Sequence, residues 1–445
     1  MKLIFWMMML FFCSAEAQQE GFRFPEGRTK TTVPFRFISN LIFIPVSVNG
    51  VELTFLVDSG VAETILFSLE NKEINFSNVK KTRFSGLGGQ AEVEGFEAVN
   101  NRVQVGNDLV DENQTVYIIP DPDFNISAHI GIPVNGVIGY NLFKNHKVRI
   151  NYQNQKITFH ETSQKIPLRG FTELPLEVER RKPYIRTYIQ QNGRENPAKM
   201  LVDLGNSDAV WLFPNTPDTE ELKQPHIDDY LGRGFNGDIF GKRSRIHHLR
   251  IGDYIFLKTT IAIPDEFSLQ NLKMVQDRKG SVGDEILKRF HIVTDYPNGK
   301  IYLKPNRSFR DPFTIDMSGL DIRHNGMHWE KDLVKVENPA MVSAAANEIT
   351  GHSSLGEFQY KFSLKPEYIV AGTRKNSPSQ EAGLLKGDKI LKINGRTTAD
   401  LTLDRIRSML RSDPGRKISL LVERNGKPLN FEFNLLDPIP YIDEN

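Results

Sequence analysis

The chain has 445 residues, 39% of them hydrophobic, so at roughly 150 residues per domain it can form about three domains with substantial cores. Its 56 basic and 55 acidic residues nearly cancel, and no long block of one sign occurs. This balance does not indicate nucleic acid or an anionic membrane surface as a partner.

The first residues have the pattern of a secretory signal peptide, expected at residues 1–17. Lys2 is followed by an apolar stretch from Leu3 to Cys13 and then by the small-x-small sequence Ala-Glu-Ala at 15–17. The apolar stretch is shorter than the about 20 residues that span a bilayer, and no later segment reaches that length. We therefore expect an exported protein, periplasmic or at the cell surface, with no membrane span.

Cys13 is the only cysteine, and it lies in the segment that export would remove. Lipid attachment at Cys13 is the alternative, although the bulky Phe12 before it is a poor match to a bacterial lipoprotein signal. With no other cysteine, the mature chain has no disulfide. Its stability must come from core packing.

Residues 34–160 and 166–305 show the same features in the same order, which indicates an internal repeat. Each half has a first strand, an apolar strand ending in Asp-x-Gly, a Gly-rich hairpin segment, a strand pair, a Gly-bounded apolar pair and a last strand. The segments are short, rich in Val, Ile, Phe and Tyr, and separated by Gly, Asn and Asp turns, so both halves are predicted to be β. We expect two similar β lobes related by a pseudo-two-fold axis, with single helical turns at YNLFKN and DEILKRF.

The two Asp-x-Gly turns are the candidate functional centre. FLVDSG contains Asp58, Ser59 and Gly60, and MLVDLG contains Asp203 and Gly205. One such turn often only ends a strand, because Asp and Ser bond to local backbone and Gly accepts positive φ. Two matched turns suggest one symmetric site.

A Gly-rich segment follows each turn: FSGLGG contains Gly86, Gly88 and Gly89, and GRGFNG contains Gly234. Both segments are candidate flaps over a substrate, because glycine permits hinge motion and close backbone approach. Plain surface hairpins are the alternative. GRGFNG also matches the dinucleotide-binding pattern Gly-x-Gly-x-x-Gly, but a strand pattern and not a helix follows it, so no cofactor is expected.

A metal site is not expected either. His247 and His248 are adjacent, so on a strand their side chains would point to opposite faces. The sequence contains no His-Glu-x-x-His pattern and no cysteine pair, which are common sources of zinc ligands.

Residues 311–437 carry a different signature. NSPSQEAGLLKGDKILKINGR resembles a long run typical of bacterial PDZ domains, and an amphipathic helix pattern and a hairpin with an Asn-Gly turn follow it. The resemblance implies an α+β domain that binds a peptide. Its carboxylate-binding loop is placed at SGLDI, with Gly319 in the loop and Leu320 and Ile322 in the pocket for the last side chain of a peptide. A strand start without a ligand is the alternative, and LKPEYIVAG is the other candidate loop.

The doubled Asp turns and the Gly-bounded apolar pairs resemble the retropepsin and pepsin group of aspartic proteases, with two lobes fused in one chain. With the PDZ signature, nearly the whole mature chain resembles exported bacterial retropepsin-like proteins with a C-terminal PDZ domain. The resemblance implies that Asp58 and Asp203 form a dyad that activates a shared water, without a metal or a covalent intermediate. It also implies that Ser59 bonds across to the other lobe. The apolar pairs at 137–138 and 281–282 would wall the dyad from water.

Leu204 departs from the family at the position that Ser59 fits, and Val61 and Asn206 stand where a hydroxyl is usual. A missing neutral hydrogen bond costs about 1 kcal/mol, which loosens a dyad without abolishing it. We therefore expect an aspartic-type endopeptidase that acts on a peptide or protein substrate and binds a PDZ ligand, either a chain end or an extended segment. The alternatives are a catalytically degenerate fold that binds peptides, and a protease that cleaves only its own chain or one dedicated partner.

Overall fold

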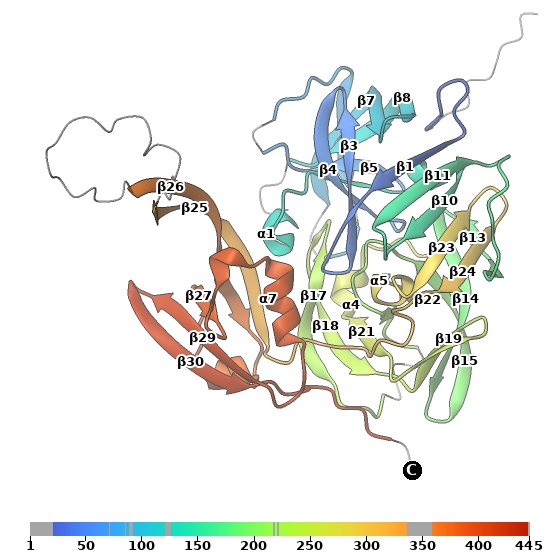
Figure 1. Cartoon of the computed structure of the whole chain (residues 1–445). Helices are drawn as coiled ribbons and strands as arrows, with labels where there is room; N and C mark the ends of the chain where they lie inside the picture. The colour runs from blue at the N-terminus through green and yellow to red at the C-terminus, as the bar shows by residue number, and fades with distance from the viewer. Residues whose placement is uncertain are drawn as a thin grey trace, which may run out of the picture.

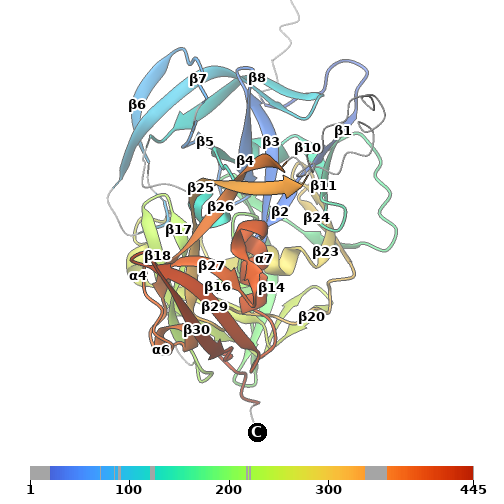
Figure 2. The ribbon, with the colours of Figure 1, turned by 60° about the vertical axis from the view of Figure 1, so that its left-hand side comes forward.

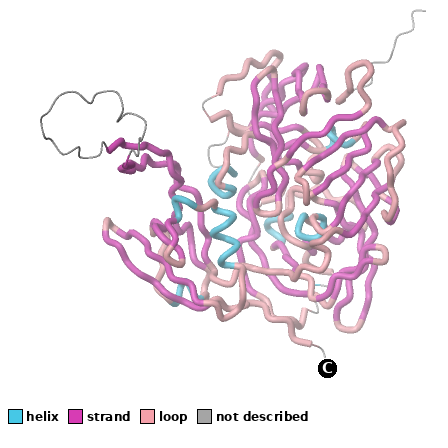
Figure 3. Tube along the Cα trace, in the orientation of Figure 1, coloured by secondary structure: helices cyan, strands magenta, loops and turns pink. Residues whose placement is uncertain are grey.

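A computed structural model of the chain describes residues 21–443, apart from 71, 85, 89–91, 121–125, 217–218, 220–221 and 336–357. The expected signal peptide, Cys13 and Gly89 lie outside the described residues. Figure 1 shows two β lobes in contact, the first from blue to cyan and the second from green to yellow, and a C-terminal unit in orange and red beside them. In Figure 3 strands dominate all three parts and the helices are short, which confirms the prediction of a mainly β chain. No helix among these residues is long and apolar enough to cross a membrane.

The first lobe is built on an eight-stranded sheet with the order β2-β3-β4-β9-β5-β8-β7-β6. The central strands β4 and β9 are parallel, whereas β9 and β5 are antiparallel, so the Gly-bounded apolar pair lies between the strands before and after the first Asp turn. The elements are β2 (Arg36–Ile38), β3 (Leu41–Val48), β4 (Val51–Val57), β5 (Thr64–Leu66), β6 (Val79–Phe84), β7 (Val93–Val105), β8 (Leu109–Ile118), α1 (Ile126–Ile130), β9 (Gly136–Ile138) and α2 (Tyr140–Phe143).

The second lobe repeats this arrangement in a ten-stranded sheet. Strand β15 is parallel to β22, and β22 is antiparallel to β16, as β4, β9 and β5 are in the first lobe. The repeated topology accounts for the repeat seen in the sequence. The elements are β13 (Glu177–Glu179), β14 (Lys182–Gln191), β15 (Arg194–Val202), β16 (Val210–Leu212), β17 (Ile227–Gly234), β18 (Gly237–Arg245), β19 (His248–Ile251), β20 (Tyr254–Leu257), β21 (Thr260–Pro264), α4 (Glu266–Leu269), β22 (Arg278–Val282) and α5 (Asp284–Leu287).

A six-stranded sheet with the order β1-β11-β10-β23-β24-β12 joins the two lobes. Strand β10 of the first lobe pairs with β23 of the second, and buried apolar residues of both lobes form one continuous cluster. The lobes therefore share both a hydrogen-bonded sheet and a core. The strands are β1 (Lys30–Pro34), β10 (His146–Asn151), β11 (Lys156–Glu161), β12 (Thr172–Pro175), β23 (Phe290–Asp295) and β24 (Lys300–Pro305). Strand β1 begins before residue 34, where the sequence pattern placed the start of the first lobe.

The C-terminal unit has its own sheet and its own apolar core. Figure 2 shows α7 in front of this sheet, whose strands β25 and β26 lie above the helix in that view. Helix α7 is amphipathic, and its N-terminus is capped by the hydroxyl of Thr402, which accepts the backbone N–H of Arg405. The elements are β25 (Leu320–Lys335), β26 (Phe358–Thr373), α6 (Pro378–Glu381), β27 (Lys389–Ile393), β28 (Arg396–Thr397), the 3₁₀ turn η2 (Thr398–Asp400), α7 (Leu403–Leu410), β29 (Lys417–Arg424) and β30 (Lys427–Asn434).

The segment that leads into this unit is held by Arg289, a buried residue of the second lobe. Its guanidinium donates to the carbonyl oxygens of Phe309 and Asp311 and lies 4.0 Å from the centre of the Phe313 ring. A buried guanidinium needs such acceptors, because an unpaired charge in an apolar setting is costly. The linker is therefore part of the second lobe's packing.

The end of the chain also returns to the second lobe, beyond residue 437, where the sequence pattern ended the domain. Arg245 donates from Nε to the carbonyl oxygen of Ile439 at 2.9 Å. Gln224 donates to the carbonyl oxygen of Ile442 at 2.7 Å and accepts its N–H at 2.9 Å. The C-terminal unit is thus tied to the second lobe at both of its ends.

Candidate active site

Asp58 and Asp203 follow the buried strands β4 and β15 directly, and each chain then turns at a glycine. The N–H of Gly60 donates to Asp58 Oδ1 at 2.7 Å, and the N–H of Gly205 donates to Asp203 Oδ1 at 3.1 Å. The two loops therefore hold their carboxylates in the same way. The apolar strands bring both carboxylates to the centre of the molecule, where the lobes meet.

The two carboxylates lie next to each other across the lobe boundary. A Cβ on Gly205 would stand 2.2 Å from Cγ of Asp58. A Cβ on Gly60 would stand 3.0 Å from Oδ1 of Asp58 and 3.1 Å from Oδ1 of Asp203. In a plain Asp-x-Gly turn the glycine would be needed for a positive φ, but neither Gly60 nor Gly205 has one. Glycine is needed because each carboxylate occupies the space that a side chain on the opposite loop would fill.

This proximity and the burial change the acidity of both groups. Burial, and secondarily the charge of Asp203, raise the pKa of Asp58 to about 7. Burial also raises the pKa of Asp203, but the positive charges of Arg278 and Lys182 and a hydrogen bond from Ser281 oppose the rise. Asp58 therefore keeps a proton at a pH where Asp203 is ionised, which is the division of roles that a carboxylate pair needs for acid–base work.

Ser59 ties the two Asp loops together. Its Oγ donates to the carbonyl oxygen of Val202 at 2.6 Å and accepts the N–H of Leu204 at 3.0 Å. Leu204, at the matching position of the second lobe, is only 3% exposed and lies in the core that the lobes share. A hydroxyl of the first Asp loop thus bonds to the second loop, but the second loop has no hydroxyl at position 204 to bond back to the first.

The Gly-bounded apolar pairs lie directly behind the Asp loops. The N–H of Asp58 donates to the carbonyl oxygen of Ile138 at 3.0 Å, and the N–H of Asp203 donates to that of Val282 at 2.9 Å. Asn206, which replaces a hydroxyl of the family pattern, donates to Ser281 Oγ at 3.2 Å. The second loop therefore retains a polar support, although from a different side chain.

The two candidate flaps, hairpins β6–β7 and β17–β18, contact each other at their tips. The N–H of Asn236 donates to the carbonyl oxygen of Leu87 at 2.8 Å, and the N–H of Gly86 donates to the side-chain oxygen of Asn236. A Cβ on Gly88 would stand 2.3 Å from the backbone of Asn236, and one on Gly234 would stand 2.2 Å from the carbonyl oxygen of Leu87. Glycine is required here because two backbones approach closely.

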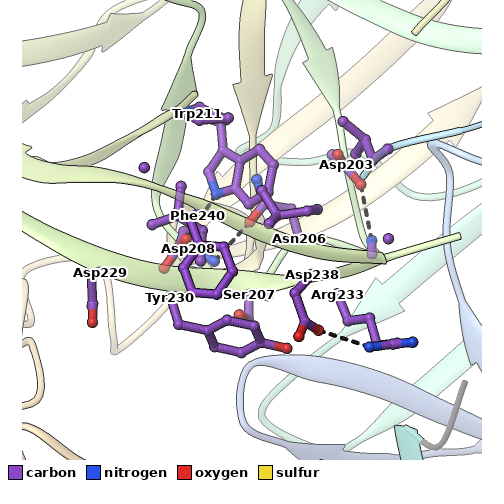
Figure 4. Close-up of a pocket in the computed structure, with 18 of the residues that line it drawn as sticks. Asp203, Asn206, Ser207, Asp208, Trp211, Asp229, Tyr230, Arg233, Asp238 and Phe240 are labelled. Atoms are coloured by element: carbon purple, nitrogen blue, oxygen red, sulfur yellow. Dashed lines mark hydrogen bonds and ion pairs between the residues drawn. The ribbon is translucent and has the colours of Figure 1, made fainter. Parts of the chain in front are cut away.

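Asp208 links the second hairpin to the loop after Asp203, and sequence reasoning missed it. Arg243 of β18 donates to Asp208 at 2.6 Å and to Asp229 of β17 at 2.8 Å, and Trp211 Nε1 donates to Asp208 at 2.7 Å. Figure 4 shows Asp208 and Trp211 beside the Asp203 loop, with the hairpin passing in front. The position of the hairpin and that of the loop are therefore coupled.

A cavity of about 1820 Å³ contains the two Asp carboxylates and extends to the C-terminal unit. It is larger than the about 300–1,000 Å³ typical of small-molecule sites, so it has room for a polymer segment. Its lining includes Leu41, Tyr230 and Phe240 from the lobes and Arg323 and Arg407 from the C-terminal unit.

Two family models match parts of this chain. An aspartyl protease family model matches residues 44–142, and a PDZ domain model matches residues 369–424. The chain combines an aspartyl-protease-like fold with a C-terminal PDZ domain. The aspartic proteinase from Irpex lacteus is similar in structure over 63% of this chain and 99% of that one, with 14% sequence identity and a TM-score of 0.42. No curated protein matches the sequence significantly.

In the PDZ domain, the loop expected to bind a carboxylate is occupied by its own side chains. The N–H groups of Ser318 and Gly319 donate to Asp316 Oδ1 at 3.1 and 2.6 Å, and the N–H of Leu320 donates to Ser318 Oγ at 3.0 Å. Leu320 and Ile322, the expected pocket residues, are 8% and 1% exposed and belong to the domain core. A chain end would have to displace Asp316 to bind here.

The PDZ domain also faces the first lobe with an edge of its sheet, which is where such domains add a peptide strand. Strand β25 is an edge strand of its sheet, and α1 of the first lobe lies against it (Figure 1). A Cβ on Gly131, just after α1, would stand 3.2 Å from Cβ of Leu403 in α7. Arg407 of α7 donates to the carbonyl oxygen of Ile322 at 3.0 Å and to Ser39 Oγ of the first lobe at 3.2 Å. The first lobe thus contacts both β25 and α7.

A strand pattern predicts that the side chains of the two adjacent histidines point to opposite faces, but in the structure they lie next to each other. His247 precedes β19, and its Nδ1 lies 3.2 Å from Nδ1 of His248. His248 Nε2 lies 3.3 Å from a carboxylate oxygen of Glu195. Across the described ranges of the chain, no three His, Cys, Asp or Glu side chains are grouped as metal ligands.

Proposed function

We propose that this chain is an aspartic-type endopeptidase in which Asp58 and Asp203 activate a shared water to hydrolyse peptide bonds. The observation that carries the proposal is the placement of two matched carboxylates in one glycine-lined space, with the pKa of Asp58 raised to about 7. Two carboxyl groups in such a space share one proton, because two charges so close are unfavourable. One carboxyl can then act as acid and the other as base.

The different protonation states of the two carboxyl groups determine which acts as base and which as acid. Asp203, ionised beside Arg278 and Lys182, takes a proton from the water as the water oxygen attacks the carbonyl carbon. Asp58 gives its proton to the carbonyl oxygen, which produces a tetrahedral diol. When the diol collapses, the C–N bond breaks, the leaving nitrogen takes the proton that Asp203 received, and one diol hydroxyl returns a proton to Asp58 as it becomes the new carbonyl. Ser59 keeps the two loops in register during these transfers.

The proposed substrate is an extended peptide segment of a protein. The cavity, of about 1820 Å³, is large enough for such a segment, and it is roofed by hairpins whose tips must part to admit it. Because the cavity continues to Arg323 and Arg407, the PDZ domain is proposed to hold a further stretch of the same chain. The internally bonded loop at 318–320 favours an extended segment over a chain end as the ligand.

Export is part of the proposal, because residues 1–17 have the signal-peptide pattern. The mature protein would act in the periplasm or at the cell surface. N-terminal sequencing of the protein recovered from those fractions tests this, and an N-terminus at Gln18 is expected. Recovery of the intact N-terminus from the cytoplasm contradicts export.

A non-catalytic peptide-binding protein is the second candidate, and the buried Leu204 favours it. The two are separated by incubating the purified protein with a diverse peptide library at about pH 4 to 8, the range over which carboxylates with raised pKa titrate, and identifying products by mass spectrometry. The enzyme is expected to cut, and Asp58→Asn and Asp203→Asn, verified as folded, are each expected to cut nothing. A folded wild-type protein that binds peptides but cuts none supports the binding function. Cleavage confined to the chain itself or to one protein partner identifies a dedicated protease.

A further inference from the structure

Lys182 begins β14 and lies beside the dyad. Strands β14 and β15 pair in antiparallel register, with Tyr184 opposite Leu201. Continuing this register past the end of β15 brings Lys182 opposite Asp203. Lys182 also lines the cavity that contains the dyad. Its ammonium group is thus placed where a bound peptide passes the reacting carboxylates.

The equivalent position of the first lobe carries an apolar residue. Strands β3 and β4 pair in the same way, with Phe43 opposite Leu56, and continuing that register brings Leu41 opposite Asp58. Leu41 lines the same cavity. The pseudo-two-fold axis therefore relates a leucine on one side of the dyad to a lysine on the other.

Lys182 is partly buried, yet its ammonium makes no hydrogen bond or ion pair with any described residue. The charged groups that face it are Arg278 of β22, the two dyad carboxylates and Glu63 of the first lobe. Lys199, also partly buried, instead contacts the carboxylates of both Glu177 and Glu179. A partly desolvated cation without a partner is costly, and an anionic ligand would offset that cost.

Arg278 adds positive charge to the same side of the cavity but is held by its own contacts. Its Nε donates to the carbonyl oxygen of Gly280 at 3.1 Å, and its guanidinium lies 5.0 Å from the centre of the Phe213 ring. Lys182 has a flexible stem and three donors, so it is the group that can reach a ligand. The positive charge of Arg278 adds to the positive electrostatic potential around the Lys182 ammonium.

We propose that Lys182, supported by Arg278, forms a subsite for a carboxylate of the substrate next to the scissile bond. This inference rests on the proposed peptidase function and specifies its substrate class. The carboxylate is either a Glu or Asp side chain or the free C-terminus of a short peptide, because both present the same oxygen acceptors. The opposite side of the dyad, at Leu41, accepts an apolar side chain.

The test uses the full-length protein and pairs of peptides that differ only by Glu or Gln near the cleaved bond, each with a free or an amidated C-terminus. Wild type is expected to cut the Glu peptide with a kcat/KM about five- to tenfold higher, because charge-assisted hydrogen bonds are about twice as strong as neutral ones. If wild type still prefers the Glu peptide when the C-termini are amidated, the recognised group is a side-chain carboxylate. Preference only for free C-termini identifies the chain end. Equal cleavage of all four peptides overturns the subsite.

Variants assign the preference to Lys182. Lys182→Met is expected to cut all four peptides equally, and Lys182→Arg is expected to keep the preference of wild type for Glu or for a free C-terminus. Lys156→Met, which changes an exposed lysine of β11 in the shared sheet, is expected to behave as wild type. Both peptides of a pair are cut by the same dyad, so their ratio does not depend on how the loss of Lys182 changes the pKa of Asp203. Retention of the preference by Lys182→Met overturns the proposal.

Failure of the proposed function is recognised separately, because wild type then cuts no peptide of either kind. In that case the same peptides are used in binding measurements with wild type and Lys182→Met. A Glu preference in wild type that the variant loses supports the carboxylate subsite in a binding protein. Equal affinities in wild type overturn it.

Discussion

The backbone N–H of Leu204 donates to Ser59 Oγ at 3.0 Å, and the leucine has no hydroxyl with which to return the contact. Ser59→Ala is therefore expected to remove the hydroxyl link between the Asp loops and to leave a buried N–H and a buried carbonyl unpaired. The expected loss is about 1–3 kcal/mol of unfolding free energy, together with a lower kcat. Chemical denaturation and peptide turnover measure the two effects. Ser59→Thr keeps the hydroxyl and serves as the control, and an alanine variant with unchanged kcat would mean that the link does not position the dyad.

Leu204→Thr tests whether the missing half of the link limits catalysis. By the pseudo-symmetry, a hydroxyl at this position is placed to reach backbone groups at Val57 and Ser59. If the lobes are a working protease, catalytic efficiency is expected to stay the same or to rise several-fold, as about 1 kcal/mol allows. Melting temperature and kcat/KM are measured on the same sample. A variant that is less stable and gains no activity would show that the leucine is needed for packing and not for chemistry.

The activity is expected to have a bell-shaped pH dependence. On the acid side it falls as Asp203 becomes protonated, and on the alkaline side it falls near pH 7 as Asp58 loses its proton. A pH profile of kcat/KM on one peptide measures both limbs. Lys182→Met removes a positive charge that lowers the pKa of Asp203, so its acid limb is expected to move to higher pH. An acid limb that Lys182→Met leaves unchanged would show that the charge of Lys182 does not affect the pKa of Asp203.

The same pKa shift affects stability. Because the pKa of Asp58 is higher in the folded than in the unfolded state, the folded state binds the proton more tightly. The resulting contribution is present below the unfolded pKa of about 4 and is lost as pH rises through about 7. Asp58→Asn avoids this loss and is expected to raise the melting temperature relative to wild type more at pH 8 than at pH 4. Equal changes at both pH values would contradict a raised pKa.

Removal of residues 311–445 is expected to lower stability and to leave cleavage of short peptides, since no dyad residue is lost. The truncation takes away the acceptors of Arg245 at Phe313 and Ile439 and part of those of Arg289, so both guanidinium groups remain buried without full pairing. Thermal unfolding and turnover of a short peptide measure the two results. Deleting only residues 438–445 is the matched control, because it keeps the PDZ strands but removes the partners of Gln224. A full truncation as stable as wild type would show that the contacts at both ends contribute nothing.

Sequence reasoning located the β lobes and both Asp turns because these features are local. Strand periodicity and the Asp-x-Gly pattern can each be recognised within a few neighbouring residues. Both occur twice in the chain, which strengthened the prediction. The contacts that complete the site are not local. Asn236 meets Leu87, and Asp208 meets Arg243, through pairings that depend on how the whole sheet folds. No composition or spacing signal marks them in advance.

The PDZ loop shows a second limit. Its sequence resembles a ligand-binding loop, and the backbone N–H groups are present as expected. Whether they are free depends on the side chain of Asp316, which lies just outside the SGLDI segment and folds back onto them. A carboxylate in this position has the same chemistry as the ligand that the pattern predicts.

Fusion of the two lobes into one chain has a consequence for substrate polarity. A dimer of identical lobes offers the same surroundings to a peptide bound in either direction, so it cannot distinguish an N-to-C strand from its reverse. Here the axis relates Leu41 to Lys182 and Ser59 to Leu204, and the shared sheet fixes one lobe against the other. A bound strand and its reversal therefore differ in energy, and the cleft has a defined upstream and downstream side.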